Sequence, residues 1–510
     1  MCRSTLFMLT VLLGVLNSVP ASAQTYKDPK FGYSIKTLPK WNAVPPKPDE
    51  KHLVMKWASA REIRDLPAEI HVYVFNRKST GGYGDIEIGD DMPASLRTAL
   101  KRLGTQKSYA AFVKSDFRRG GMSLAKGKKL RLKRHKSRTI ESAKIYATSR
   151  ASMFSRGSQK MADYFVLVGV VTTPDWEYAV ECFASEKAIR KLQGSFQGII
   201  KSFRLLDAPR VEEQVAATGS RQSRSNGKIG TAGDYERTTL TEREAAKKRA
   251  REQVARTPGW WYLETPRYML VTNCEEKRKP FIKDVGRRLE AIRDKYEKDF
   301  PPAKPITAVS IVRICKDQKG YFDYGGSRGS AGYWSSSAKE LVFYRADSTD
   351  KPLKVLNHEA FHQYIFYSCG KLSPHSWYNE GYGDYYAGAV IQGKRISKIK
   401  PFLWRRDTIR NAARKGTHVP IKDIIRYTQR EYYANPQLCY AQGWSMIYFL
   451  KTALPKGHPW QKILPTYLKT LQTTKSRDKA VDAAFKDIDL DAFEAAWRTY
   501  TIRGTKVRAK

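Results

Sequence analysis

Short apolar runs and turns alternate through the first part of the chain. Between residues 24 and 206 the apolar runs are FGYSI, HLVMKWA, EIHVYVF, YFVLVGVVTT and WEYAVECFA. Runs of this length, bounded by turn-forming residues, predict β-strands. Residues 185–203 instead repeat apolar side chains at helical spacing, and Ser185 stands where a helix N-cap belongs. We therefore predict an antiparallel sheet backed by a helix over residues 24–206.

The two ends of this region carry a family resemblance. The opening FGYSIKTLPKWNAVP and the closing GSFQGIIKSFRLL resemble secreted α+β domains related to the photosystem extrinsic protein PsbP and the Mog-type fold. The resemblance contains no catalytic motif. It implies an accessory domain with a binding or positioning role.

Beyond residue 206 the apolar periodicity is lost. Residues 207–240 are mostly small and polar, a composition typical of a mobile linker. Thr241 and Glu244 form a capping-box pattern, which predicts a charged helix that ends near residue 255. We expect residues 207–256 to connect two domains, the second of which spans residues 257–510.

Strand and helix patterns alternate at the start of this second domain. The runs WWYLETPRYMLVT, ITAVSIVRI and KELVFYR predict strands, and residues 279–300 have the period of a helix. The rest of the domain is mainly helical. The predicted fold class is therefore α+β, with an N-terminal antiparallel sheet and helix, then a small sheet followed by a mainly helical half.

The first 23 residues have the features of an export signal. Arg3 precedes an apolar stretch, and the small residues around Ala23 form a cleavage site. No later stretch reaches the roughly 18 apolar residues that a transmembrane helix needs. We expect a secreted or periplasmic protein whose mature chain has no transmembrane segment.

The charge of the chain is strongly positive. There are 92 Lys and Arg against 50 Asp and Glu, a formal net charge of +42. The densest cluster is KGKKLRLKRHKSR at residues 126–138, and no base-reading or stacking motif accompanies it, so specific nucleic-acid recognition is not expected. The favoured interpretation is a solvated basic hairpin or loop, and the alternative is a surface for an anionic polymer or the cell envelope.

Five cysteines would remain after the signal is removed. Cys274 and Cys315 each end a predicted strand, and adjacent parallel strands would bring them together. Cys369 and Cys439 lie beside predicted helices. An exported protein permits disulfides between these residues, but the spacing leaves the connectivity open.

The segment HEAFH at residues 358–362 carries the first chemical signal. Four residues along a helix turn about 400°, so His358 and His362 share one face and can bind one metal ion. Glu359 lies beside the first ligand, where it can activate a zinc-bound water.

A second segment, SWYNEGYGDYYAG, follows HEAFH. Its Glu380 is far enough from His362 for a loop to reverse and a second helix to return to the metal. Asp384 is four residues further, on the same helix face, and can reach the ring N–H of a zinc-bound histidine.

Together these motifs resemble the gluzincin clan of zinc metallopeptidases, and in particular the peptidase-MA-like secreted bacterial proteins. The resemblance covers roughly residues 257–500. It implies Zn²⁺ held by His358, His362 and Glu380, with Glu359 as the catalytic base. It also implies a tyrosine that donates to the developing oxyanion, because gluzincins of the M1 type have one about sixty residues past the glutamate ligand.

Tyr440 stands at that distance, and Tyr432 and Tyr433 are nearby alternatives. His375 lies between the ligand motifs. We interpret it as an exposed loop residue, with a transition-state contact as the alternative.

Residues 325–344 are rich in glycine and serine before the run KELVFY. They predict either a flexible surface loop or an approach for an extended peptide, which would pair with KELVFY as an edge strand beside the metal.

The function predicted from the sequence is a secreted zinc-dependent peptidase that hydrolyses peptide bonds of a peptide or protein substrate through a zinc-bound water. The alternative is a catalytically inactive zinc-binding protein that binds an anionic polymer or the envelope surface.

Overall fold

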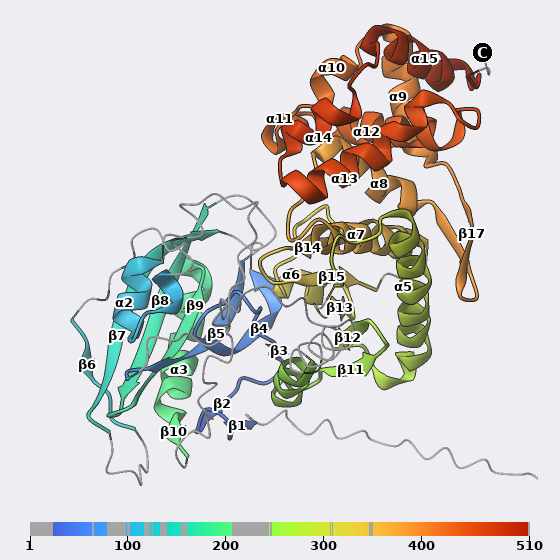
Figure 1. Cartoon of the computed structure of the whole chain (residues 1–510). Helices are drawn as coiled ribbons and strands as arrows, with labels where there is room; N and C mark the ends of the chain where they lie inside the picture. The colour runs from blue at the N-terminus through green and yellow to red at the C-terminus, as the bar shows by residue number, and fades with distance from the viewer. Residues whose placement is uncertain are drawn as a thin grey trace, which may run out of the picture.

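A computed structural model gives the fold of the chain (Figure 1). It describes residues 24–63, 66–78, 102–116, 126–132, 140–154, 161–206, 247–306, 310–345 and 350–507, together with residues 98, 122, 124, 244 and 308. The predicted signal at residues 1–23 and the predicted linker at residues 207–240 lie outside the described residues, as do residues 133–138 of the basic cluster.

The N-terminal part contains the predicted antiparallel sheet with its helix. Seven strands pair in the order β3-β4-β5-β9-β8-β7-β6, and three more form a small sheet, β1-β2-β10. The strands are β1 (Thr25–Asp28), β2 (Tyr33–Lys36), β3 (Asn42–Val44), β4 (Leu53–Ile63), β5 (Leu66–Asn76), β6 (Lys128–Lys129), β7 (Ser142–Phe154), β8 (Met161–Thr172), β9 (Trp176–Ala184) and β10 (Arg204–Leu205).

Two helices pack against the large sheet. Helix α3 (Glu186–Ser202) begins after Ser185 as predicted, although the Ser185 side chain makes no capping hydrogen bond. Its buried residues, including Phe196 and Ile200, form one core with the sheet, and α2 (Tyr109–Ser115) contributes to a second core. Strand β6, which lies within the basic cluster, is an exposed edge strand.

The second part begins with a five-stranded sheet in the order β11-β12-β13-β15-β14. Strands β12, β13 and β15 are parallel, and β11 and β14 are antiparallel to their neighbours. The bounds are β11 (Trp261–Glu264), β12 (Tyr268–Thr272), β13 (Ser310–Cys315), β14 (Gly332–Ser335) and β15 (Glu340–Tyr344).

Two strand predictions in this sheet were wrong. WWYLETPRYMLVT is a hairpin of two strands and not one strand, because the chain turns at Pro266, which has no backbone N–H to donate. KELVFY is β15, an inner strand, because the glycine- and serine-rich segment before it supplies β14 as the edge.

Helices complete the second part (Figure 1). Helices α5 and α7 cover one face of the five-stranded sheet, and the later helices pack around α8. The helices are α5 (Lys279–Asp299), α6 (Gln318–Asp323), α7 (Asp350–Ser368), α8 (Ser376–Ala387), α9 (Leu403–Lys415), α10 (Ile421–Ile424), α11 (Gln429–Ala434), α12 (Pro436–Thr452), α13 (Ile463–Thr474), α14 (Arg477–Ala484) and α15 (Leu490–Arg503); a hairpin of β16 (Ala389–Gln392) and β17 (Arg395–Ile399) follows α8.

The opposite face of the five-stranded sheet packs against the N-terminal part. Val44 and Ala58 of the N-terminal part share a buried cluster with Trp260, Val271 and Val342 of the second part. The indole N–H of Trp260 also donates to the carbonyl oxygen of Ala43 at 3.0 Å. The two parts therefore share a buried apolar interface.

The five cysteines in the described part of the chain are not paired. Cys182, Cys274, Cys315, Cys369 and Cys439 are all buried and free. Strands β12 and β13 are parallel neighbours, as expected, so the ends that carry Cys274 and Cys315 lie close together without a bond between them. None of the described helices combines the length and the apolar character needed to cross a bilayer.

Two buried histidines make the stability of the fold depend on pH. Burial lowers the pKa of His52 to about 4, and burial together with the charge of Arg477 lowers that of His375 to about 4. The unfolded chain takes up these protons below about pH 6.5, whereas the folded protein takes them up only near pH 4. Stability contributed by the neutral imidazoles is therefore lost as the pH falls from about 6.5 to 4.

We predict that each histidine lowers the free energy of unfolding by about 2 kcal/mol between pH 7 and pH 5. Denaturant unfolding of the metal-free protein at both pH values measures this difference. His375→Gln should reduce the pH-dependent loss, whatever its effect at pH 7. A variant that loses as much stability as the wild type between the two pH values would contradict the prediction.

Candidate metal centre

Helices α7 and α8 bring three metal-binding side chains together. The Nε2 atoms of His358 and His362 lie 3.1 and 3.2 Å from the same oxygen, Oε2 of Glu380. His362 and Glu380 are buried, and His358 is partly buried. A tetrahedral zinc site with bonds of about 2.0 to 2.1 Å places its ligand atoms roughly 3.3 Å apart. The donor types and their separations therefore fit the ion that the sequence predicts.

Each imidazole is oriented through its other nitrogen. Nδ1 of His358 lies 3.0 Å from Oδ1 of Asp384, and Nδ1 of His362 lies 3.0 Å from Oδ1 of Asn379. Because a carboxylate and an amide oxygen only accept, each Nδ1 must carry the proton. Both Nε2 lone pairs are then available to a metal. Asp384 lies beside His358, where the sequence predicted a partner for a ring nitrogen; Asn379 was not predicted, although it directly precedes Glu380.

The charge of Asp384 is itself paired with an arginine. Nε of Arg405, on α9, is 2.6 Å from Oδ2 of Asp384, close enough for an ion pair although not aligned as a hydrogen bond. The guanidinium also lies over the rings of Trp404 and Tyr440, at 4.4 and 4.8 Å. The positive charge compensates a carboxylate that is only 2% exposed. No local spacing in the sequence connects Arg405 to the motif, so it was not predicted.

The second oxygen of Glu380 is held by a tyrosine. Oη of Tyr433 donates to Oε1 of Glu380 at 2.7 Å, which leaves Oε2 toward the two imidazoles. Tyr440, at the start of α12, stacks against the ring of His358 with 6.3 Å between centroids. Burial, followed by the charge of Glu380, raises the pKa of Tyr440, so its hydroxyl stays protonated and can donate.

The other two candidates for an oxyanion donor lie elsewhere. Tyr432 is buried and donates to the carbonyl oxygen of Cys439 at 2.7 Å. His375 is not an exposed loop residue: it is 6% exposed, and its Nδ1 lies 3.1 Å from the hydroxyl of Tyr467. Its place just before α8 buries it beneath α13. Tyr432 and His375 are therefore bonded to groups outside the three candidate ligands, whereas Tyr440 contacts His358 and Tyr433 contacts Glu380.

Glu359 points toward the edge strand of the sheet. The backbone N–H of Trp334, in β14, donates to Oε2 of Glu359 at 2.9 Å. The Trp334 ring packs against Phe366 and Tyr367 of the same helix α7. The carboxylate is outside the set of three ligands and is partly exposed. Glu359 is therefore a carboxylate on the ligand helix α7 that is not one of the three candidate ligands.

The charges of the centre favour a cation among these groups. Burial lowers the pKa of His358, but hydrogen bonds with Asp384 and Glu380 raise the pKa by more than burial lowers it. The pKa of His358 therefore lies well above its ordinary value. Burial raises the pKa of Glu380, but the charge of His362 and hydrogen bonds from both imidazoles lower it well below its ordinary value. In the metal-free protein, protons on the neighbouring imidazoles balance the charge of this carboxylate. A bound metal ion would take the place of those protons.

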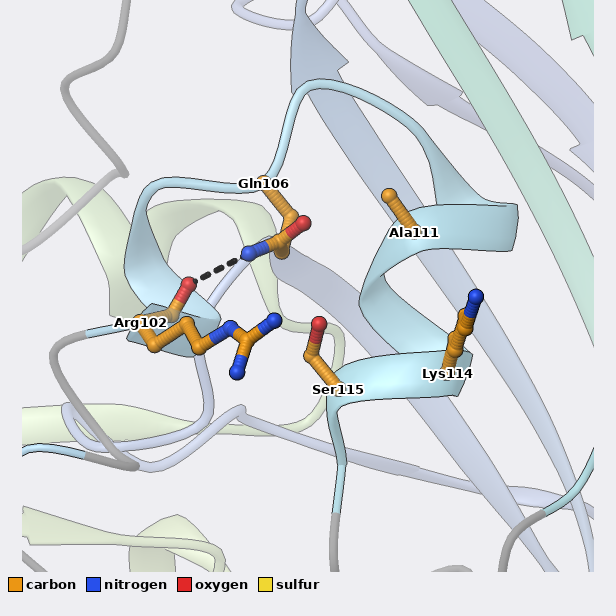
Figure 2. A pocket seen from close by; sticks show the side chains of 5 residues that line it. All are labelled: Arg102, Gln106, Ala111, Lys114 and Ser115. Atoms are coloured by element: carbon orange, nitrogen blue, oxygen red, sulfur yellow. Dashed lines mark hydrogen bonds between the residues drawn. The ribbon is translucent and has the colours of Figure 1, made fainter.

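A separate shallow pocket of about 330 Å³ lies in the N-terminal part (Figure 2). It is lined by Arg102, Gln106, Ala111, Lys114 and Ser115. Gln106 donates through Nε2 to the carbonyl oxygen of Arg102 at 2.7 Å. This lining contains neither a carboxylate nor an imidazole, so it offers none of the usual ligands of zinc.

Comparisons with known proteins give little beyond this geometry. No protein-family model matches the chain, and no curated protein matches it. The solution structure of cyanobacterial PsbP (CyanoP) from Synechocystis sp. PCC 6803 is similar over 38% of this chain and 98% of that one, with 17% identity and a TM-score of 0.23. A crystal structure from Bacteroides thetaiotaomicron VPI-5482 is similar over 55% of this chain and 72% of that one, with 10% identity and a TM-score of 0.18.

The first of these agrees with the PsbP-like resemblance of the N-terminal sequence. With TM-scores this low, neither similarity carries an argument about function. The comparisons do not identify the gluzincin family, so that resemblance stays a prediction, and the candidate site depends on its own side chains.

Gly383 provides a test of the centre that leaves every ligand unchanged. A Cβ atom there would lie 2.8 Å from Cε1 of His358, so only glycine lets the imidazole lie against α8. We predict that Gly383→Ala displaces the ring and lowers zinc affinity about 10- to 100-fold, as loss of an outer partner does. Competition with a chromogenic chelator measures this affinity.

Gly198→Ala, in α3, is the matched control, because no atom lies within 4 Å of the added Cβ. Its zinc affinity should equal that of the wild type. Wild-type affinity in Gly383→Ala would show that His358 does not bind the metal.

Proposed function

We propose that this protein is a gluzincin-like zinc peptidase that acts outside the cytoplasm on a peptide or protein substrate. The observation that carries the proposal is the convergence of two imidazole nitrogens and one carboxylate oxygen next to a carboxylate that is not a ligand. Three protein ligands are the pattern of a catalytic zinc site, whereas structural sites usually have four. The separate carboxylate, Glu359, supports hydrolysis over simple metal storage.

When bound, zinc would act as a Lewis acid that polarises the substrate carbonyl group and lowers the pKa of a bound water toward neutral pH. Glu359 would take the proton from the attacking water and pass it to the leaving amine. Its Oε2 accepts from the Trp334 N–H, so Oε1 is the oxygen left to hold the proton. Asp384 and Asn379 would keep the imidazoles in the tautomer that binds metal.

Strand β14 would align the substrate. It pairs with β15 on one side, and no strand among the described residues pairs with its other side. An extended peptide could add to that side through backbone hydrogen bonds, close to Glu359. From the sequence we expected KELVFY to pair with the substrate, and we propose this role for its neighbour β14 instead.

Tyr440 would stabilise the oxyanion. Its ring lies over the ligand His358, and its protonated hydroxyl is close enough to Glu380 and Glu359 to interact with both charges. A donor at this position would face charge that develops on the substrate carbonyl. Tyr433 would instead hold Glu380 in its ligand position.

The first test separates the base from the ligands. We predict that Glu359→Gln retains zinc near one per chain but loses peptidase activity by about 10²-fold or more, because general-base catalysis alone is worth about 10²- to 10⁴-fold. Glu380→Ala should lose zinc. Casein or peptide-library cleavage, with and without a chelator, and metal analysis measure the two effects.

Wild-type protein with bound zinc and no chelator-sensitive cleavage would favour the inactive zinc-binding alternative. Full activity in Glu359→Gln would remove Glu359 from the mechanism.

A pair of tyrosine variants tests the oxyanion donor. Tyr440→Phe should lower kcat about 10²- to 10³-fold with zinc affinity and KM little changed, because only a transition-state donor is lost. Tyr433→Phe should mainly lower zinc affinity, because Glu380 loses its 2.7 Å partner. Steady-state kinetics and zinc titration distinguish them. The opposite pattern would assign the donor to Tyr433.

A further inference from the structure

The edge strand that holds Glu359 is supported from the N-terminal part. Residues 45–50, with the sequence PPKPDE, connect β3 to β4 and reach the segment that includes β14; we name them the 45–50 loop. Figure 1 shows β3 and β4 at the side of the seven-stranded sheet that faces α6 and β14. The apolar cluster that contains Val44 and Ala58 anchors this region to the second part.

The 45–50 loop contacts Tyr333 in β14 and Ser337 just beyond the end of that strand. The ammonium group of Lys47 lies 5.6 Å from the ring centroid of Tyr333 and 5.6 Å from that of Tyr324. Oδ2 of Asp49 accepts a hydrogen bond from Oγ of Ser337 at 2.7 Å.

The hydroxyl of Ser337 that contacts Asp49 also contacts β14. It lies 3.1 Å from the hydroxyl of Ser335, the last residue of β14. Tyr333 and Ser335 are the two neighbours of Trp334, whose N–H holds Glu359. A continuous path of contacts therefore connects the N-terminal part to the proposed base.

The loop itself is rigidly held. The Lys47 backbone N–H donates to Oε2 of Glu50 at 2.7 Å, and Glu50 forms an ion pair with the buried Lys56 at 2.8 Å. The carbonyl oxygen of Pro46 accepts from Gln253 at 2.6 Å.

A glycine in the second part of the chain leaves room for the side chain of Lys47. Gly325 has a φ of +106°, and a Cβ there would lie 2.5 Å from the lysine Nζ. Any other residue would displace the ammonium group from the aromatic rings.

We propose that the 45–50 loop is a positioning element of the metal centre, in which Lys47 and Asp49 fix β14 and thereby the carboxylate of Glu359. This inference rests on the proposed peptidase function for its effect on rate. Its structural part, the restraint of β14, stands without it. The N-terminal part thus contributes to the site and is more than a tethered accessory domain.

Hydrogen exchange in the full-length protein tests the restraint directly. In Lys47→Ala and Asp49→Ala, peptides that cover residues 332–337 should exchange at least about fivefold faster, because the strand opens more often. Lys47→Arg and Asp49→Asn should restore slow exchange, since they keep the cation and the acceptor. Ser337→Ala should reproduce Asp49→Ala while leaving the N-terminal part intact, which separates loss of this contact from misfolding.

Lys30→Ala is the matched control. Lys30, also in the N-terminal part, forms an ion pair at 2.6 Å with Glu252, in the segment that precedes the second part, and no ion pair or hydrogen bond of Lys30 reaches β14. This variant should leave exchange in residues 332–337 unchanged. Zinc content should be unchanged in all of the variants, because the three ligands lie on α7 and α8.

Kinetics test the consequence for Glu359. Lys47→Ala should lower kcat about tenfold, because a small displacement of a reacting group is costly. In a Glu359→Gln background the same substitution should have no further effect.

Unchanged exchange in residues 332–337 of Lys47→Ala, Asp49→Ala and Ser337→Ala would overturn the restraint. Faster exchange with unchanged kcat would overturn the positioning role. Faster exchange in a protein whose wild type has no chelator-sensitive cleavage would uphold the restraint and overturn the peptidase function instead.

Discussion

The contact between helices α7 and α8 determines most of the second half of the molecule. It places two imidazoles and a carboxylate within hydrogen-bonding distance in a region largely closed to water. Nearly every residue of α8 is buried, since α7 packs on one side of it and α12 on another. Burying ionisable groups costs free energy unless each has a partner. The neighbouring helices supply those partners.

The partners come from widely separated parts of the chain. Asn379 and Asp384 lie on α8 itself, whereas Arg405 comes from α9 and Tyr433 from α11. Each fixes the orientation of a group that would bind the metal or hold one of its ligands. These outer contacts preorganise the candidate metal centre, so an ion would need little rearrangement of its ligands to bind. The mainly helical half is therefore a support for the centre as well as a hydrophobic core.

The five-stranded sheet connects the centre to the rest of the protein. One face packs on α5 and α7, which carries Glu359, and the other packs on the N-terminal part. Strand β14 touches both, because Trp334 contacts α7 while Tyr333 lies beside Lys47. A sheet with two buried faces cannot lose one cover without exposing apolar side chains to water. The division into an accessory and a catalytic unit is thus less sharp than the composition of the chain indicates.

Short-range pattern determined much of this molecule in advance. The period of 3.6 residues placed His358 and His362 on one face of α7, and Glu380 and Asp384 on one face of α8. Alternating short apolar runs predicted the antiparallel N-terminal sheet, and longer periodic runs predicted α3 and α5. These features follow from residues close together in the sequence. Local geometry is enough to relate them.

Only the tertiary structure decided which of these faces meet. Arg405 and Tyr433 reach the centre, and the 45–50 loop reaches the segment of β14, through packing between distant elements that no local spacing encodes. The order of the strands in the sheet decided that β14 and not KELVFY is the edge strand. A glycine- and serine-rich segment can form either a loop or a strand, and the hydrogen bonds offered by β15 make it a strand here. His375 has a polar sequence context, yet packing beneath α13 buries it. Periodicity sets which side chains share a surface, while contacts across the chain set what that surface touches.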